Sequence, residues 1–223
     1  FVVDTNETSY AGTAYTFTAR SLSHQLYTWG DAERGQLGQN SLIKRSSPVQ
    51  VLGNNWTDAK STPNQTRSWI LGTNDGTLWT LGYNHKGQLG HNDRSDRSSP
   101  VQIPGTNWDG ICAAGHNDHA PIFATKTDGT AWAWGGNTVG QLGLNESGNN
   151  EYRSSPVQIP GTNWAQFGSN SYSRTGYGIK TDGTMWVMGR GHYGQLGLSQ
   201  SGNTAYSSPV QIPGTTWSWA DGG

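Results

Sequence analysis

Short apolar runs separated by glycine-rich turns recur along this chain. The runs at residues 78–81, 131–134 and 185–188 each follow an Asp-Gly-Thr triplet. Asp-Gly is a favoured two-residue hairpin turn because both residues tolerate positive φ, so each run is predicted to be a strand that leaves a hairpin. The apolar residues are continuous and do not alternate with polar ones, which indicates that both faces of each strand are covered.

The two faces of these predicted strands differ in side-chain size. Trp132 and Trp134 share one face, whereas Ala131 and Ala133 share the other, and the other two runs show the same division into larger and smaller side chains. Large side chains of one sheet can then interdigitate with smaller ones of the next, as a wedge-shaped array requires. We therefore expect the recurring tryptophans to be mostly buried between sheets: Trp79, Trp132, Trp134 and Trp186.

A tandem repeat organises the chain. The tetrapeptide Gly-Gln-Leu-Gly occurs with spacings of 52, 53 and 54 residues, at 35–38, 87–90, 140–143 and 194–197. The pentapeptide Ser-Ser-Pro-Val-Gln keeps the same phase, at 46–50, 98–102, 154–158 and 207–211. This period is typical of one propeller blade or one solenoid turn. We interpret both motifs as scaffold, with the glycines at positive φ in tight turns and the proline at a strand start or an outer sheet edge.

The repeat predicts one domain over residues 1–223. Its units are approximately 1–53, 54–105, 106–161 and 162–214, and residues 215–223 start a further unit. Because the chain begins and ends inside a repeat, we expect it to be a window of a longer polypeptide.

Composition supports an all-β repeat protein and disfavours several classes of partner. The chain has 32 Gly and 11 Trp but only 13% charged residues, which is unlike a helical protein. The formal net charge of −1 offers no basic field for a phosphate backbone, so nucleic acid is not an expected partner. No apolar run approaches the roughly 18 residues of a membrane span, so no membrane partner is expected either.

These motifs, together with Asp-Gly-Thr-x-Trp-x-Trp-Gly, resemble the repeats of the regulator of chromosome condensation family from about Leu22 onward. The near-identity of the repeats is similar to family members predicted in bacteria and their phages. The resemblance implies β-propeller blades of four-stranded antiparallel sheets, with four repeats forming part of a seven-bladed ring. Further repeats of the same longer chain, or another subunit, would complete that ring. In the family's eukaryotic exchange factor an inserted hairpin wedge acts on a small GTPase, and no such insertion interrupts these repeats.

The repeats differ most between the Trp that follows Ser-Ser-Pro-Val-Gln and the Asp-Gly-Thr turn. These stretches, 59–73, 113–126 and 166–180, are rich in Asn, Ser, Tyr, Arg and Trp, as recognition loops are. Trp, Tyr and Arg dominate binding hot spots, so we predict partner binding by Arg67, Trp69, His116, His119, Tyr172, Arg174 and Tyr177. Ordinary variation of exposed loops is the competing interpretation.

The sequence carries no recognisable catalytic, metal-binding or cofactor-binding motif. His116 and His119 lie close together, but no further ligands occur at a recognisable spacing, so neither a metal nor a cofactor is predicted. The hypothesis is a non-enzymatic recognition or structural module that binds a protein or a cell-surface glycan. Such a module would belong to a phage tail or fibre or to a bacterial surface, and would be extracellular or virion-exposed. The alternatives are a guanine-nucleotide exchange factor for a small GTPase and a propeller-type enzyme inhibitor.

Overall fold

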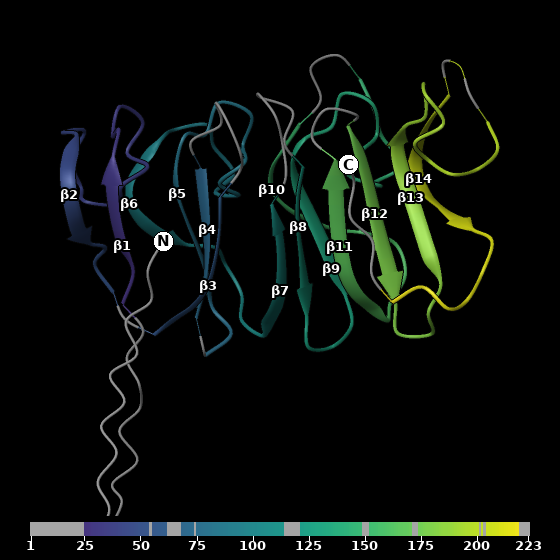
Figure 1. Ribbon diagram of the computed structural model, residues 1–223, viewed down its shortest axis with the longest axis horizontal. Coiled ribbons are helices and arrows are strands. Elements are labelled where there is room, and N and C mark those ends of the chain that lie inside the picture. Colours follow the sequence, from purple (N-terminus) through teal and green to yellow (C-terminus); the bar gives the residue numbers. More distant parts are fainter. Residues whose placement is uncertain are drawn as a thin grey trace, which may run out of the picture.

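A computed structural model describes residues 25–53, 55–61, 68–73, 75–113, 121–148, 152–170, 174–200, 202 and 204–218. Over these ranges the regular structure is entirely β, as predicted (Figure 1). Within the same ranges no helix is long and apolar enough to cross a membrane.

The described strands form antiparallel sheets, which we name blades 1 to 4 in chain order. Blade 1 pairs β1 (Tyr27–Gly30) with β2 (Arg45–Gln50). Blade 2 has the order β3 (Trp56–Ser61), β4 (Ser68–Thr73), β5 (Leu78–Gly82) and β6 (Arg97–Gln102). Blade 3 consists of β7 (Trp108–Ala113), β8 (Pro121–Lys126), β9 (Ala131–Gly136) and β10 (Tyr152–Gln158). Blade 4 consists of β11 (Trp164–Asn170), β12 (Thr175–Lys180), β13 (Met185–Arg190) and β14 (Ala205–Ile212).

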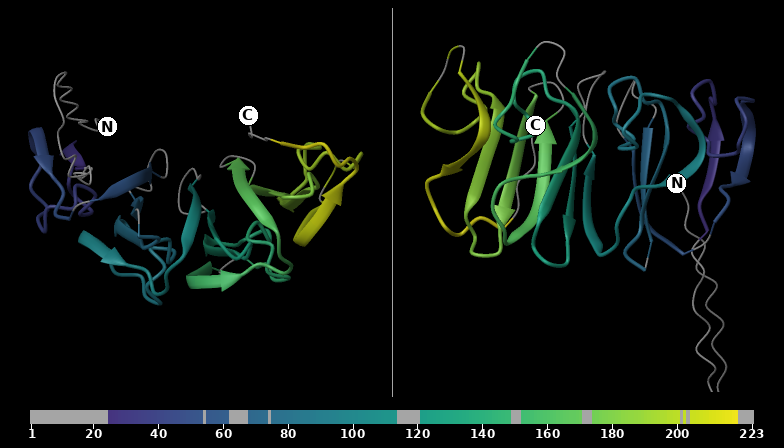
Figure 2. Two further views of the ribbon diagram at one scale, coloured as in Figure 1. Left: turned by 90° about the horizontal axis from the view of Figure 1, so that it is seen from below. Right: turned by 180° about the vertical axis from the view of Figure 1, so that it is seen from behind.

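The blades follow one another along a curved arc. In Figure 2 the first strands of blades 2 to 4, β3, β7 and β11, lie on the concave side, and the last strands, β6, β10 and β14, lie on the convex side. The prolines of Ser-Ser-Pro-Val-Gln therefore lie in edge strands, where a missing backbone N–H disrupts no ladder. This placement confirms the outer-edge alternative of the sequence prediction.

The Asp-Gly-Thr triplets form the hairpin turns between the second and third sheet strands. In blade 3, Asp128 Oδ1 accepts hydrogen bonds from the Thr130 backbone N–H at 2.9 Å and from its hydroxyl at 2.7 Å. The Thr130 hydroxyl in turn accepts a hydrogen bond from Trp132 Nε1 at 3.1 Å. The same three contacts recur in blades 2 and 4. The turn therefore fixes the orientation of the first tryptophan of the strand that follows it.

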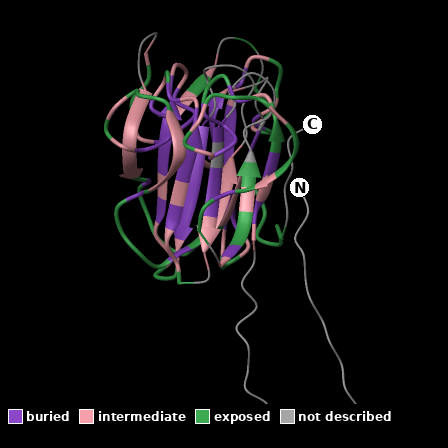
Figure 3. Ribbon diagram, turned by 90° about the vertical axis from the view of Figure 1, so that its left-hand side faces the viewer, coloured by how far each residue is buried: buried purple, intermediate pink, exposed green. Residues whose placement is uncertain are grey.

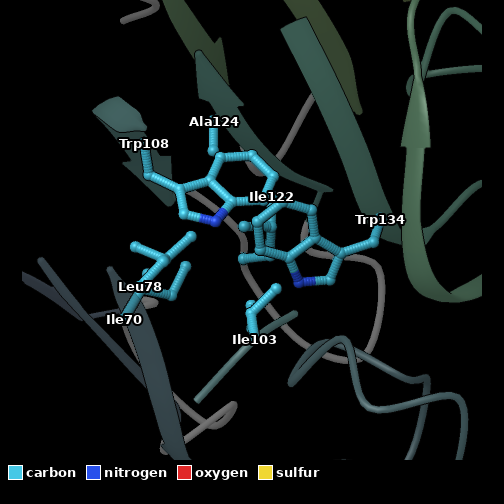
Figure 4. Close-up of a cluster of buried hydrophobic side chains, with 7 residues drawn as sticks. All are labelled: Ile70, Leu78, Ile103, Trp108, Ile122, Ala124 and Trp134. Atoms are coloured by element: carbon cyan, nitrogen blue, oxygen red, sulfur yellow. The ribbon is translucent and has the colours of Figure 1, made fainter. Parts of the chain in front are cut away.

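The hydrophobic core lies between neighbouring blades. One buried cluster joins Ile70 and Leu78 of blade 2 to Trp108, Ile122 and Trp134 of blade 3 (Figure 4). Figure 3 shows that the buried residues concentrate in the strands.

The next junction pairs large side chains with small ones, as expected. Ala131 and Ala133 of blade 3 pack with Trp164 and Met188 of blade 4. Trp134 is completely buried, and its Nε1 donates to the Gln88 carbonyl of blade 2 at 2.9 Å. The other three recurring tryptophans are half-buried between blades, at Trp79, Trp132 and Trp186.

In blades 1 to 3, Gly-Gln-Leu-Gly folds into a latch that joins the blade to the next one. Its glutamine turns back on the chain, so that Gln88 Oε1 accepts the Lys86 backbone N–H at 2.8 Å. A Cβ added to Gly87 would lie 2.5 Å from Ser154 Cα in β10, and one added to Gly90 would lie 3.5 Å from Pro156. The latches of blades 1 and 3 contact Ser98 and Ser207 in the same way. All latch glycines have positive φ, which confirms the predicted turns.

Large exposed apolar side chains among the described residues belong to the first and last blades or the segments next to them. They are Trp29, Leu42, Ile43, Leu52, Tyr193 and Trp217. The outer faces of these two blades have no neighbouring blade among the described residues, which accounts for the exposure of Trp29 and Trp217, because their counterparts Trp134 and Trp164 are buried.

Candidate binding surface

The blades present two ends that differ in how much their sequences vary. We call the end where the first and second sheet strands connect, beyond residues 61, 113 and 170, the connection end. The opposite end, which carries the Asp-Gly-Thr turns, is the turn end. The antiparallel registers place Ser68 opposite Gly82, Pro121 opposite Gly135 and Thr175 opposite Gly189. The segments that lead into the latches therefore also begin at the connection end.

The structure describes part of the predicted binding set. Arg67, His116, His119 and Tyr172 lie outside the described residues. Trp69 belongs to β4, where its backbone pairs with Leu81 of β5. The binding role of these residues stays a prediction.

Arg174 lies at the connection end of blade 4. It has positive φ, +54°, and its carbonyl accepts the Arg190 backbone N–H at 3.1 Å. Its Nη1 lies 3.5 Å from Thr138 Oγ1, in the segment that leads into the latch of blade 3. Arg174 therefore connects the ends of two neighbouring blades.

Tyr177 lies within strand β12 and not in an irregular loop. Its side chain is 6% exposed and packs with Ile179, Met185 and Val187. A Cβ added to Gly168, its partner in β11, would lie 2.1 Å from the Tyr177 ring, so the glycine leaves room for this ring. Direct contact with a partner would require this side chain to leave its cluster.

Much of the variable stretches forms strands, which corrects the view of them as loops. Residues 164–170 and 175–180, for example, pair as β11 and β12 over six registered positions. Their Asn, Ser, Gly and Tyr content resembles that of a loop, but pairing with β13 holds β12 extended. Backbone pairing has overridden local composition here, as tertiary context often does for strands.

A second group of variable residues at the connection end was not singled out from the sequence. The four residues before each Gly-Gln-Leu-Gly differ in every repeat, at 31–34, 83–86, 136–139 and 190–193. Tyr83 stacks on His85 with ring centroids 5.9 Å apart, and the Arg34 guanidinium of blade 1 lies 5.2 Å from the Tyr83 ring. Tyr193 is 80% exposed beside His192. Variation directly next to a constant motif was the sequence signal that could have identified them.

Charges at this end are mixed. Arg34 pairs with Asp96 of blade 2 at 3.6 Å, and Lys44 pairs with Glu33 at 3.4 Å and with Asp31 at 3.5 Å. The hydrogen bond from Lys44 to Glu33, followed by the charge of Asp31, raises the lysine pKa. Exposed pairs of this kind are screened by salt and orient side chains more than they stabilise the fold.

Within the described ranges, no group of three or more His, Cys, Asp or Glu side chains is arranged to hold a metal ion. The described connection end instead combines aromatic, cationic and polar side chains from several blades. Such a surface is suited to binding a partner.

A known repeat family and several curated proteins match this chain. The model of the regulator of chromosome condensation (RCC1) repeat matches residues 23–62, 75–117, 128–170 and 182–219. The Protein RCC2 homolog of Danio rerio is 29% identical over 198 residues, which cover 80% of this chain and 38% of that protein. Human Protein RCC2 is 31% identical over 139 residues, covering 60% of this chain and 25% of that protein. This chain thus spans less than half the length of either relative.

Solved structures share the fold at low sequence identity. Prp20p from Saccharomyces cerevisiae, described with its binding properties to Gsp1p and histones, matches with a TM-score of 0.68 and 18% identity. That match covers 86% of this chain and 47% of the Prp20p chain. Human WBSCR16 matches with a TM-score of 0.63 and 19% identity, covering 86% of this chain and 50% of that chain. The RCC1 repeat model matches well over half of the residues of this chain. This chain therefore belongs to the regulator of chromosome condensation (RCC1) repeat family, and its sheets are propeller blades.

Proposed function

We propose that this chain is a non-enzymatic recognition module that binds a protein partner through its connection end. The observation that carries the proposal is the contrast between the two ends of the blades. The turn end repeats one Asp-Thr-Trp hydrogen-bond arrangement in blades 2 to 4. The connection end carries different aromatic and cationic residues in each blade. A constant scaffold that supports variable surface residues is typical of recognition proteins.

The biological setting belongs to the same proposal. Near-identical tandem repeats and the absence of an inserted wedge favour a phage tail or fibre, or a bacterial surface protein, over a nuclear exchange factor. In that setting the module is extracellular or virion-exposed, and a surface protein or glycan of the target cell is its partner. The binding of Prp20p to Gsp1p and histones supports protein recognition by this fold.

Binding of the fluorescently labelled chain to a panel of bacterial cells, measured by flow cytometry, tests the proposal. The test variant combines Arg174→Ala with Tyr193→Ala at the connection end. The control combines Thr127→Ala with Thr181→Ala, two exposed residues at the turn end. We expect the control to label cells like the unmodified chain and the test variant to lose most labelling, with circular dichroism unchanged. Equal labelling by both variants would contradict a site at the connection end.

The exchange-factor alternative has its own measurement. Release of fluorescent GDP from a small GTPase should remain at the spontaneous rate when the chain is added. Accelerated release that the Arg174→Ala and Tyr193→Ala variant abolishes would replace the recognition proposal with guanine-nucleotide exchange.

A further inference from the structure

A pocket recurs at the described junctions between blades, close to the turn end and therefore away from the connection end. Its volume is about 360 Å³ beside blade 2 and the segment that joins it to blade 1, 350 Å³ between blades 2 and 3, and 450 Å³ between blades 3 and 4. These volumes fall in the range of small-molecule sites, about 300–1,000 Å³. We call the last two the lysine pockets, because Lys126 lines one and Lys180 the other.

Two tryptophans set at a steep angle form one wall of each lysine pocket. Trp108 and Trp132 have ring centroids 6.2 Å apart at 75°, and Trp164 and Trp186 have centroids 6.3 Å apart at 73°. Trp132 and Trp186 are half-buried, so part of each indole remains open to the pocket. The last strand of the same blade contributes a Ser-Pro pair to the lining, Ser155-Pro156 in one pocket and Ser208-Pro209 in the other. The preceding blade contributes Asn92 or Asn145.

The lysine ammonium groups are held by aromatic faces. Lys126 Nζ lies 4.6 Å from the Trp108 ring centroid and 4.9 Å from that of Trp132. Lys180 Nζ lies 4.8 Å and 5.0 Å from the corresponding rings of blade 4. A Cβ added to Gly161 would lie 3.2 Å from Lys180 Nζ, so this glycine keeps space for the ammonium.

No carboxylate among the described residues is within ion-pairing distance of either ammonium. The neighbouring Asp128 and Asp182 instead accept hydrogen bonds from Thr130 and Thr184. The buried indole N–H groups of Trp108 and Trp164 likewise have no acceptor in the described part of the chain. The negative charges of Asp128 and Asp182 still act on Lys126 and Lys180 from a longer distance, so each ammonium has a carboxylate nearby but no direct ion pair among the described residues.

The pocket of blade 2 has the same tryptophan pair without the cation. Trp56 and Trp79 have ring centroids 6.1 Å apart at 90°, but Thr73 occupies the position of the lysine. Asp75 also lines this pocket. The chain thus contains its own comparison site, which has the tryptophan pair and the aspartate but no lysine.

We propose that the two lysine pockets bind carboxylate-bearing sugar residues of an acidic polysaccharide. The open indole face packs against the apolar face of a sugar ring, and the ammonium forms a charge-assisted hydrogen bond with the sugar carboxylate. Polar side chains at the pocket edge accept and donate hydrogen bonds to sugar hydroxyls, among them Asn92 and Ser155. The lysine pockets lie apart from the connection end, which the proposed function uses, so failure of one proposal would not contradict the other.

The recurrence of the pocket favours a polysaccharide over an acidic peptide. Each lysine pocket is a partly open recess lined by residues of two blades, whereas peptides that add to sheets need an extended edge of free backbone groups. Equivalent sites at successive junctions match a ligand that repeats along its own length. Binding two such sites on one polymer strengthens attachment through effective concentration without any new contact.

Isothermal titration calorimetry with methyl α-galacturonoside and methyl α-galactoside tests the proposal, because these sugars differ only in the carboxylate at C6. The chain should bind the acidic sugar at two sites, and the neutral sugar roughly ten-fold more weakly or not at all. Lys126→Thr should remove one site, and the double variant with Lys180→Thr should remove both. Threonine occupies this position naturally in blade 2, so the fold accommodates it. Binding should also weaken with added salt.

Several outcomes would overturn the proposal. They are equal affinity for the two sugars, unchanged binding by the folded double variant, and absence of binding by the unmodified chain. Saturable binding of a glutamate-rich peptide at the lysine pockets, without binding of the acidic sugar, would assign them to acidic peptides instead. If acetate displaced the acidic sugar when the two were present at equal concentration, the pockets would recognise a bare carboxylate and not a sugar. In the unmodified chain the sugar comparison remains informative even if a lysine variant unfolds.

Discussion

Replacing the first glycine of a latch with alanine tests the contact between blades. Gly87 has φ +72°, a conformation that costs an L-residue about 1–2 kcal/mol. The added Cβ would lie 2.5 Å from Ser154 Cα, whereas carbon atoms in contact prefer about 3.5–4.0 Å. Moving β10 away to relieve that overlap costs a further 1–3 kcal/mol, as overpacking of a core typically does. Gly87→Ala should therefore lower the free energy of unfolding by about 2–5 kcal/mol.

The fourth Gly-Gln-Leu-Gly supplies the matched control. Gly194 has φ +80°, but the nearest described atom to its added Cβ is the Gln200 carbonyl oxygen at 3.8 Å. Gly194→Ala should therefore cost only the backbone strain, about 1–2 kcal/mol. Urea unfolding followed by tryptophan fluorescence measures both variants, and their difference isolates the contact with the next blade. Equal destabilisation of the two variants would refute the assignment of Gly-Gln-Leu-Gly as a latch.

Further predictions concern the core and two titrating groups. Trp134→Ala should destabilise the chain by about 3–5 kcal/mol in the same urea assay, because this buried ring joins two blades; a loss below about 1 kcal/mol would contradict that role. Hydrogen bonds from Thr130 lower the Asp128 pKa, so its stabilising contribution is present above about pH 4 and is lost as pH falls through the folded pKa. Asp128→Asn should weaken the acid dependence of unfolding, and an unchanged dependence would count against the turn hydrogen bonds. Burial, and then the charge of Arg97, lower the His91 pKa, so stability should decrease as pH falls below about 6.5. An NMR titration midpoint for His91 at or above that value would contradict its burial.

Much of the fold follows from local sequence chemistry. Asp-Gly fixes the hairpin turns, the continuous apolar runs predict strands covered on both faces, and the alternation of Ala and Trp predicts packing between blades. The structure confirms these features in blade 3, where Ala133 and Trp134 lie on opposite faces and enter different clusters. Each depends on residues only a few positions apart, so a sequence pattern can reveal them.

The functional surfaces depend on longer-range contacts, and the sequence predicted less of them. Composition suggested a loop around Tyr177, but pairing with β13 makes it a buried strand residue. The significance of Tyr83 and His85 became visible only when the fold placed them at the connection end. Lys126 lies in a variable stretch, and its place between two tryptophans depends on three strands meeting at one turn. The order of residues along the chain does not show that these three strands bring the lysine between two tryptophans.

Nearly identical latches create a problem of pairing during folding. The latch of blade 2 meets Ser154, but the same Ser-Ser-Pro sequence occurs at 98–100 and 207–209, so the motif alone does not specify its partner. The segments between blades, 103–107 and 159–163, have five residues each, enough to span about 18 Å when fully extended. A blade can therefore be placed only beside the one that precedes it in the chain. Chain connectivity, and not recognition between different sequences, gives the array its order, and lengthening either segment with flexible residues should produce mispaired or strand-exchanged species.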